Sequence, residues 1–471
     1  MINRVDGALG DGLERLVVAH HRRRLGRVGW MSALDAPAGG WAEGSPPPRG
    51  GNDLDVFIDG SEALPAIAQA VEGAHERVWV AGWHFTPELR VGDTTLRELL
   101  AEAAERIEVK VLAWAGAPLP LFHPDRKEVR AMRERLVAGT RIECALDDLE
   151  RPMHCHHEKL VIVDGRIAFV GGIDLTTLGG NRLDTPRHPA RGSVGWHDAT
   201  ARVQGPAAED VADHFAVRWS EVTGEKLAYD QAEAAGGLEV QVVRTVPNNV
   251  YDHLPRGDFR ILESYLRAVR SAERLVYLES QFLWSYEFVA ALEEKLRNPP
   301  ADDFRLVVVL PAHPNNGQED TRGQLGVLVE ADGGEGRFLA CTLWQAGEDS
   351  DPVYVHAKIG IVDDRWLTLG SANLNEHSFF NDTEMNVVTH DPEVARAVRL
   401  RLWSEHLGCD PAELEADPAL IVDERWRPLA QEQLERRRRG DRTTHRLLLL
   451  PHVSRRAKGL LGPLNGFFVD G

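Results

Sequence analysis

One sequence pattern decides the fold of this protein, and it occurs twice. Residues 157–172 read HEKLVIVDGRIAFVGG, and residues 356–371 read HAKIGIVDDRWLTLGS. In both copies a His-x-Lys triplet precedes a mostly β-branched run, and an Asp-Gly or Asp-Asp turn leads into a second apolar run. Two such runs joined by a short turn are typical of a β-hairpin. We therefore predict a hairpin after each triplet.

The repetition extends beyond the hairpins. ERVWV at residues 76–80 recurs as ERLVY at 273–277, and VKVL at 109–112 recurs as LVVV at 306–309. Together with the hairpins, these segments match in the same order at a spacing of about 197 to 199 residues. Ordered matches at nearly constant spacing indicate a tandem duplication.

Within each half, β-branched runs alternate with amphipathic stretches, which are residues 62–74, 96–104, 259–272 and 288–296. This alternation predicts an α/β fold of two tandem α/β sandwich repeats with mixed sheets, related by a pseudo-twofold axis. The expected domains are an N-terminal extension with a Pro/Gly-rich linker (1–50), a first repeat (51–235), a second repeat (236–430) and a basic and apolar C-terminal tail (431–471). We expect the extension to be short and partly helical and the linker to cover residues 36–52.

Composition narrows the class of protein. The chain has 471 residues, 43% of them apolar and 27% charged, which is ordinary for a globular protein. Its formal net charge of −19 repels nucleic acid and anionic bilayers at long range, so a polyanionic partner must meet a local basic pocket. The four cysteines have no CxxC spacing, which argues against a zinc ribbon or a disulfide framework. With neither a secretory signal nor a long apolar run, we expect a cytoplasmic protein, possibly peripheral to a membrane.

The His-x-Lys triplets carry the first chemical signal. Residues two apart on a strand point to the same side, so His157 lies beside Lys159, and His356 lies beside Lys358. An imidazolium and an ammonium side by side repel each other unless an anion lies between them. A chance pair on a solvated edge strand would explain one copy, but two copies in register favour a phosphate site.

These motifs resemble the phospholipase D superfamily, whose signature is HxKxxxxD followed by Gly-Gly or Gly-Ser. Asp164 leads to Gly171-Gly172, and Asp363 leads to Gly370-Ser371. The likeness is closest to plant-like, eukaryotic-type phospholipases D and runs from about residue 53 to about residue 410, without the calcium-dependent lipid-binding module of that group. The resemblance implies the catalytic set His157, Lys159, Asp164, His356, Lys358 and Asp363.

The implied reaction is a double displacement at a phosphodiester. One histidine attacks phosphorus to form a phosphohistidine, and the other donates a proton to the leaving alcohol and then activates water or an acceptor alcohol. The resemblance places His157 as the nucleophile and His356 as the acid/base, a choice that sequence symmetry leaves open. Lys159 and Lys358 would neutralise the non-bridging oxygens. Two inversions at phosphorus imply net retention of configuration.

Further residues are expected to support this chemistry. Ser371 and Asn373 would add neutral donors, which their counterparts Gly172 and Asp174 cannot do. The resemblance points to Glu384 and Asp198 as the carboxylates that orient the imidazoles. Expected rim residues are Trp196, His197 and Gln281. Because Asp164 and Asp363 lie on the turns, we interpret them as braces of the hairpins, although they belong to the signature.

No metal and no cofactor is required by this chemistry. The run His154-Cys155-His156-His157 could suggest zinc, but HExxH and CxxC partners are missing. We interpret His154 and His156 as packing or rim residues.

The expected function is that of a phospholipase D, which hydrolyses the distal phosphodiester of glycerophospholipids to phosphatidic acid and also transfers the phosphatidyl group to small alcohols. The partners would be a phospholipid at a membrane surface and water or an alcohol, without nucleic acid, and the protein would be a monomer because one chain carries both half-sites. Two alternatives remain: a phosphodiesterase or nuclease of the same superfamily acting on nucleic acid or another soluble diester, and a catalytically silent lipid-binding scaffold. Candidate membrane contacts are residues 115–123, residues 176–195 and the C-terminal LLLL and GFF segments.

Overall fold

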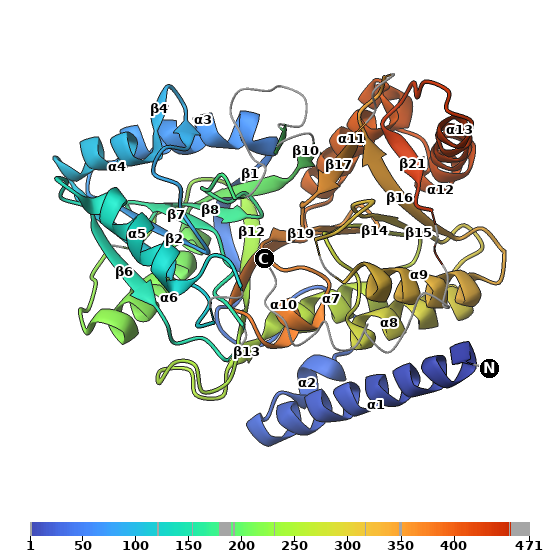
Figure 1. The fold of residues 1–471 in the computed structure, drawn as a ribbon, viewed down its shortest axis with the longest axis horizontal. Coiled ribbons are helices and arrows are strands. Elements are labelled where there is room, and N and C mark those ends of the chain that lie inside the picture. The colour runs from blue at the N-terminus through green and yellow to red at the C-terminus, as the bar shows by residue number, and fades with distance from the viewer. Residues whose placement is uncertain are drawn as a thin grey trace.

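The computed structural model describes residues 2–119, 122–152, 154–178, 190–191, 194–229, 231–315, 317–347, 351–451 and 453. The two halves lie side by side, the first coloured blue to green and the second yellow to red (Figure 1). None of the helices in these described stretches combines the length and the apolar character needed to cross a membrane.

The first half is built on a mixed sheet. Its strands follow the spatial order β6 (Glu143–Asp147), β5 (Glu108–Trp114), β2 (Arg77–Gly82), β7 (Leu160–Val163), β8 (Ile167–Gly171), β11 (Ala199–Gln204) and β1 (Arg49–Ile58). The first three strands run parallel, and every later pairing is antiparallel.

The second half repeats this order and these directions. The corresponding strands are β16 (Phe338–Trp344), β15 (Arg305–Val309), β14 (Leu275–Glu279), β18 (Ile359–Val362), β19 (Trp366–Gly370), β20 (Glu384–Thr389) and β12 (Leu238–Val246). Strand β1 also pairs with β12, which joins the two sheets. The predicted α/β fold of two tandem repeats with mixed sheets is confirmed.

Helices cover both faces of the sheets (Figure 1). The outer cores contain α3 (Asp59–Glu72), α4 (Leu96–Ala104) and α5 (Arg126–Val137) in the first half, and α7 (Arg260–Ser271), α8 (Tyr286–Arg297) and α9 (Gln318–Asp332) in the second. A single core between the halves contains α6 (Pro206–Thr223) and α11 (Pro392–Leu407). The four predicted helical stretches correspond to α3, α4, α7 and α8.

Shorter elements complete the fold. They are α2 (Met31–Leu34), β3 (Arg90–Val91), β4 (Thr94–Thr95), β9 (Ala190–Arg191), β10 (Val194–His197), β13 (Asp258–Phe259), β17 (Pro352–Val355), α10 (Glu376–Phe380), a 3₁₀ turn at Pro411–Leu414, α12 (Pro418–Ile421), a π-helical turn at Val422–Trp426, α13 (Arg427–Arg438) and β21 (Leu447–Leu449). Strand β10 of the first half pairs in parallel with β17 of the second, a further link between the halves.

The two predicted hairpins are present as β7–β8 and β18–β19. Asp164 and Asp363 begin their turns with φ values of 53° and 54°, a left-handed conformation that Asp adopts more readily than most residues. The carboxylate of Asp164 accepts backbone N–H groups from residues 75–77, and that of Asp363 accepts them from residues 273–275. Each aspartate therefore ties its hairpin to the start of the neighbouring strand.

The N-terminal segment differs from expectation. It forms a 27-residue helix, α1 (Ile2–Val28), that runs along the outside of the second half (Figure 1). The expected linker is also shorter, because residues 49–52 already belong to β1. Its middle part packs on the second half, where Gln241 binds the backbone of Ala42 and Pro46.

The C-terminal LLLL segment is not a membrane contact. Leu447 and Leu448 lie in β21, which pairs with β16, and both side chains are buried. The pairing of β21 with β16 therefore places these apolar side chains inside the protein. The GFF segment and most of residues 176–195 lie outside the described residues, and the division into four domains stays a prediction.

Candidate active site

The two motif histidines lie just before β7 and β18, and each is held by a carboxylate from the other half. The Nδ1 of His157 lies 3.0 Å from Oε1 of Glu384 at the start of β20. The Nδ1 of His356 lies 2.8 Å from Oδ2 of Asp198, between β10 and β11. A proton on Nδ1 facing the carboxylate leaves Nε2 unprotonated, as the nucleophilic or basic atom. Both imidazoles are thus prepared for the same chemistry.

Backbone contacts reinforce this reciprocal arrangement. The amide of His157 donates to the carbonyl of Thr383, next to Glu384, at 2.9 Å. The amide of His356 donates to the carbonyl of His197, next to Asp198, at 2.7 Å. Main chain and side chain therefore bring each histidine to the opposite half.

The two motif lysines are also buried beside the histidines. The Nζ of Lys159 donates to the carbonyl of His157 at 2.6 Å and lies 3.4 Å from Oδ1 of Asp174. The Nζ of Lys358 donates to the carbonyl of His356. Burial lowers the pKa of Lys358 to about 8, against the attraction of Asp198, and repulsion from Lys159 adds to this lowering. A buried site with two ammonium groups favours an anionic ligand between them.

The surroundings of His356 favour its neutral form. Burial and the nearby charge of Lys358 lower the pKa of this imidazole from its usual value, while Asp198 opposes the change. An anion bound in the site would act in the direction of Asp198 and raise the pKa.

The second residue of each Gly-Gly or Gly-Ser pair lies next to the carboxylate that holds a motif histidine, and the size of this residue fits that carboxylate. A Cβ atom on Gly172 would lie 2.2 Å from Oδ1 of Asp198, so the absence of a side chain makes room for that carboxylate. At the equivalent position the hydroxyl of Ser371 donates to Oε2 of Glu384. Ser378 of α10 donates to the other oxygen at 2.6 Å. In this structure the proton of Ser371 therefore supports the carboxylate, and its predicted role as a phosphate donor stays a prediction.

Two of the predicted rim residues lie together with Asn373. Trp196 stacks on Tyr354 with ring centroids 4.7 Å apart, and its centroid lies 4.9 Å from that of His356. Gln281 donates to the hydroxyl of Tyr354 at 2.8 Å and accepts from the amide of Asn373 at 3.3 Å. This aromatic and amide cluster adjoins the His356 half of the site.

The third predicted rim residue lies elsewhere. The side chain of His197 is fully buried and its Nε2 lies 2.8 Å from Oε2 of Glu279, so it is a core residue rather than a rim residue. The hairpin aspartates are also not brought to the histidines, because they lie beyond β7 and β18 at the turns.

Sequence reasoning missed Ser378 and Tyr354. Ser378 lies three residues after Asn375, whose side chain accepts the amide of Ser378 as the N-cap of α10, and Asn-x-x-Ser is too common to single out. Tyr354 lies two residues before His356 on β17, so strand alternation could have placed it on the side of the histidine.

The fold and site geometry agree with comparisons to known proteins. The sequence profile described as "Cardiolipin synthase, PLD-like domain" matches residues 265–404, which include the second His-x-Lys motif. Residues 265–404 therefore carry a phospholipase D-like domain, and the chain is distantly related to phospholipases D over most of its length. Members of the superfamily are phosphodiesterases and phosphatidyltransferases, and both halves of this chain contribute a superfamily motif.

Curated relatives extend the match over most of the chain. Phospholipase D A of Dictyostelium discoideum is 24% identical over 469 residues, covering 78% of this chain and 36% of that protein. Phospholipase D alpha 4 of Arabidopsis thaliana is 23% identical over 503 residues, covering 75% and 64%. A cardiolipin synthase of Staphylococcus aureus is 23% identical over 356 residues, covering 74% and 66%. The chain thus spans between about a third and two thirds of these superfamily relatives.

A solved structure has a similar fold. The phosphatidylserine synthase of Haemophilus influenzae aligns with a TM-score of 0.54 at 13% sequence identity, covering 79% of this chain and 89% of that protein.

Proposed function

We propose that this chain is a phospholipase D that hydrolyses the distal phosphodiester of glycerophospholipids and transfers the phosphatidyl group to alcohols. The observation that carries the proposal is the reciprocal pairing of two histidines with two carboxylates beside two buried lysines. The phospholipase D relatives supply the lipid class.

The first step forms a covalent intermediate. The Nε2 of His157 attacks phosphorus, the bond between phosphorus and the headgroup oxygen breaks, and protonated His356 gives its Nε2 proton to that oxygen. The anionic phosphodiester raises the pKa of His356 on binding, so protonation accompanies substrate capture. Lys159 and Lys358 stabilise the charge on the non-bridging oxygens.

The second step releases the phosphatidyl group. Neutral His356 takes a proton from water or an alcohol, the resulting oxygen attacks phosphorus, and the bond between phosphorus and His157 breaks. Water yields phosphatidic acid, and an alcohol yields a new phosphatidyl ester. The two inversions predict net retention at phosphorus, in line with the expectation from the motifs.

The decisive experiment is incubation of the protein with vesicles of mixed phospholipids and ethanol, followed by mass spectrometry of the lipids. Phosphatidylethanol and a released headgroup are expected, and H157A must abolish both. Formation of cardiolipin from phosphatidylglycerol would reassign the chain as a transferase to lipid alcohols. Cleavage of DNA or a soluble diester without any lipid product would contradict the proposal.

A further inference from the structure

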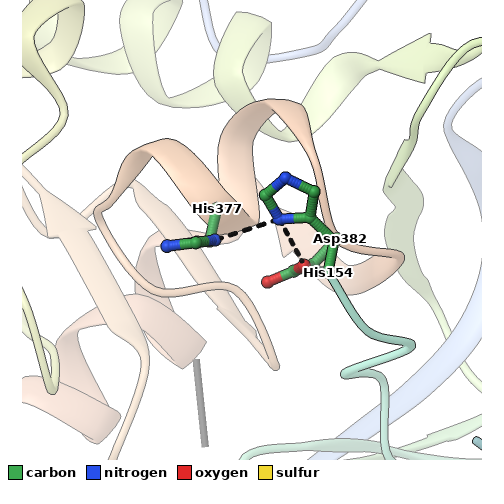
Figure 2. A group of neighbouring side chains, drawn as sticks. All are labelled: His154, His377 and Asp382. Carbon is green, nitrogen blue, oxygen red and sulfur yellow. Dashed lines mark hydrogen bonds and ion pairs between the residues drawn. The ribbon is translucent and has the colours of Figure 1, made fainter. Parts of the chain in front are cut away.

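Three side chains from both halves converge beside the proposed active site. His154 comes from the loop between β6 and β7, His377 from α10, and Asp382 from the segment before β20. Figure 2 shows Nδ1 of His154 directed at both Nδ1 of His377 and the carboxylate of Asp382. Asp382 and His377 are buried, and the side chain of His154 is 11% exposed.

The spacing of these atoms matches the edges of a metal coordination sphere. The two Nδ1 atoms lie 3.2 Å apart, and Nδ1 of His154 lies 3.5 Å from Oδ1 of Asp382. The three ligand atoms lie within 4.8 Å of one another. A tetrahedral Zn²⁺ with ligands at about 2.0–2.1 Å separates their donor atoms by about 3.3–3.4 Å.

Hydrogen bonding within the cluster does not account for it. One proton on Nδ1 of His154 can point to His377 or to Asp382 but not fully to both, so it cannot satisfy both of these neighbours at once. The outer oxygen of Asp382, Oδ2, is buried and has no hydrogen-bond partner among the described residues. A cation at the centre would satisfy both groups.

We propose that His154, His377 and Asp382 bind a divalent transition-metal ion such as Zn²⁺, with water in the remaining position. The site is independent of the proposed reaction, which still needs no metal. It also differs from the expectation that His154 only packs or lines a rim, because its partners come from the other half and not from the adjacent Cys155 and His156.

The role of this metal site is to brace the junction between the halves. His154 lies three residues before His157, and Asp382 lies two residues before Glu384. His377 precedes Ser378, which donates to Glu384. Oδ1 of Asp382 also accepts the amide of Cys155 at 3.0 Å, so the ion would tie together the segments that hold the His157–Glu384 pair.

The test uses the full chain purified without a histidine tag. After removal of metal by a chelator, we expect one equivalent of Zn²⁺ to bind in calorimetry and to raise Tm, and Co²⁺ to give the visible absorption of a tetrahedral site. H377A and D382A should lose all three signals. If H377A fails to fold, H154A replaces it, because His154 is the most exposed ligand.

Two histidine variants serve as controls. Nδ1 of His253 lies 2.9 Å from Oε1 of Glu221, and neither residue belongs to the proposed metal site. H253A should therefore bind metal like the wild type. His406 belongs to another histidine and carboxylate group, with His197 and Glu279. Loss of Zn²⁺ binding in H406A, with binding retained in H377A, would overturn the proposal. It would also be overturned if the wild type bound less than about 0.1 equivalent of Zn²⁺ and showed no shift in Tm.

Discussion

Individual residues make the two half-sites unequal in spite of the duplication. The first half pairs Gly172 with the shorter acid Asp198, and the second pairs Ser371 with the longer acid Glu384. The Asn373 position of the second half is Asp174 in the first, where it lies near Lys159. The two halves therefore hold their histidines in the same way but differ in the residues that surround the carboxylates.

The space at Gly172 leads to a first prediction. In G172A the new Cβ would lie 2.2 Å from Oδ1 of Asp198, so the carboxylate must move away from His356. We expect kcat to fall about 10²–10⁴-fold, the usual effect of a misplaced acid/base, with the protein still folded. G237A is the control, since no atom lies within 4 Å of its Cβ position, and equal activity of the two variants would refute the argument.

The buried lysine predicts the alkaline limb of the pH profile. With a pKa of about 8, Lys358 loses its charge as pH rises through 8 in the ligand-free enzyme. We expect kcat/KM for a soluble phosphodiester to fall about tenfold by pH 9, because this ratio reports the free enzyme. His356 must be protonated in the first step, so its lowered pKa causes a separate fall that begins at lower pH and that K358R should keep. In K358R the fall centred near pH 8 should disappear, and a fall that persists there would exclude Lys358 as its source.

At the scale of secondary structure, the hairpin turn tests whether the motif aspartates are structural. D363A removes an acceptor of three backbone N–H groups and places Ala at a φ of 54°. We expect a loss of about 2–4 kcal/mol in the free energy of unfolding by urea. D363N should lose less, and kcat of the folded fraction should stay unchanged in both. A collapse of kcat without destabilisation would instead place Asp363 in catalysis.

Helix α1 docks through a pH-dependent contact. His21 stacks on Phe380 of α10 and lies 2.8 Å from Glu376. Burial alone would lower the pKa of His21, but Glu376 and Glu287 raise it to about 9, and burial raises the pKa of Glu376 to about 7. The raised pKa of His21 stabilises docking at low pH, so the contact weakens as pH rises from about 6.5 to about 9.

Limited proteolysis of residues 29–48 measures this docking. We expect faster cleavage at pH 9.5 than at pH 6, with up to about 3 kcal/mol of docking free energy contributed by His21. In H21A cleavage should be fast at both values, and an unchanged pH dependence in that variant would remove His21 from the explanation.

For the whole molecule, one chain contains both reciprocal pairs. Each half carries one histidine and the carboxylate that holds the other, and β1–β12 and β10–β17 pair the halves directly. A half alone therefore has neither complete pair.

This organisation predicts the outcome of mixing inactive variants. An equimolar mixture of H157A and H356A should remain at background activity in the vesicle assay, because every chain lacks one histidine of the proposed site. Recovery of a quarter to a half of the wild-type activity would show that the site forms between two chains.

Much of this protein follows from local sequence patterns. The duplicated order of apolar runs specifies the repeated sheet, and the amphipathic stretch at 96–104 coincides with α4 because a Thr95–Glu98 capping box starts it. The hairpins follow from β-branched runs around an Asp turn. These features depend on interactions between residues that are close in sequence, so short segments of sequence are enough to predict them.

Only the tertiary structure decided which carboxylate meets which histidine. Glu384 is 28 residues after His356 but bonds His157, 227 residues away, and Asp198 bonds His356 instead of His157. The two acids occupy equivalent positions in two similar halves, so local sequence does not tell which histidine each acid meets. The parallel pairing of β10 with β17 brings the segment of Asp198 beside that of His356. The tertiary structure also decided the place of the LLLL segment. Its apolar side chains suit a bilayer or a protein core equally, and the pairing of β21 with β16 buries them in the core.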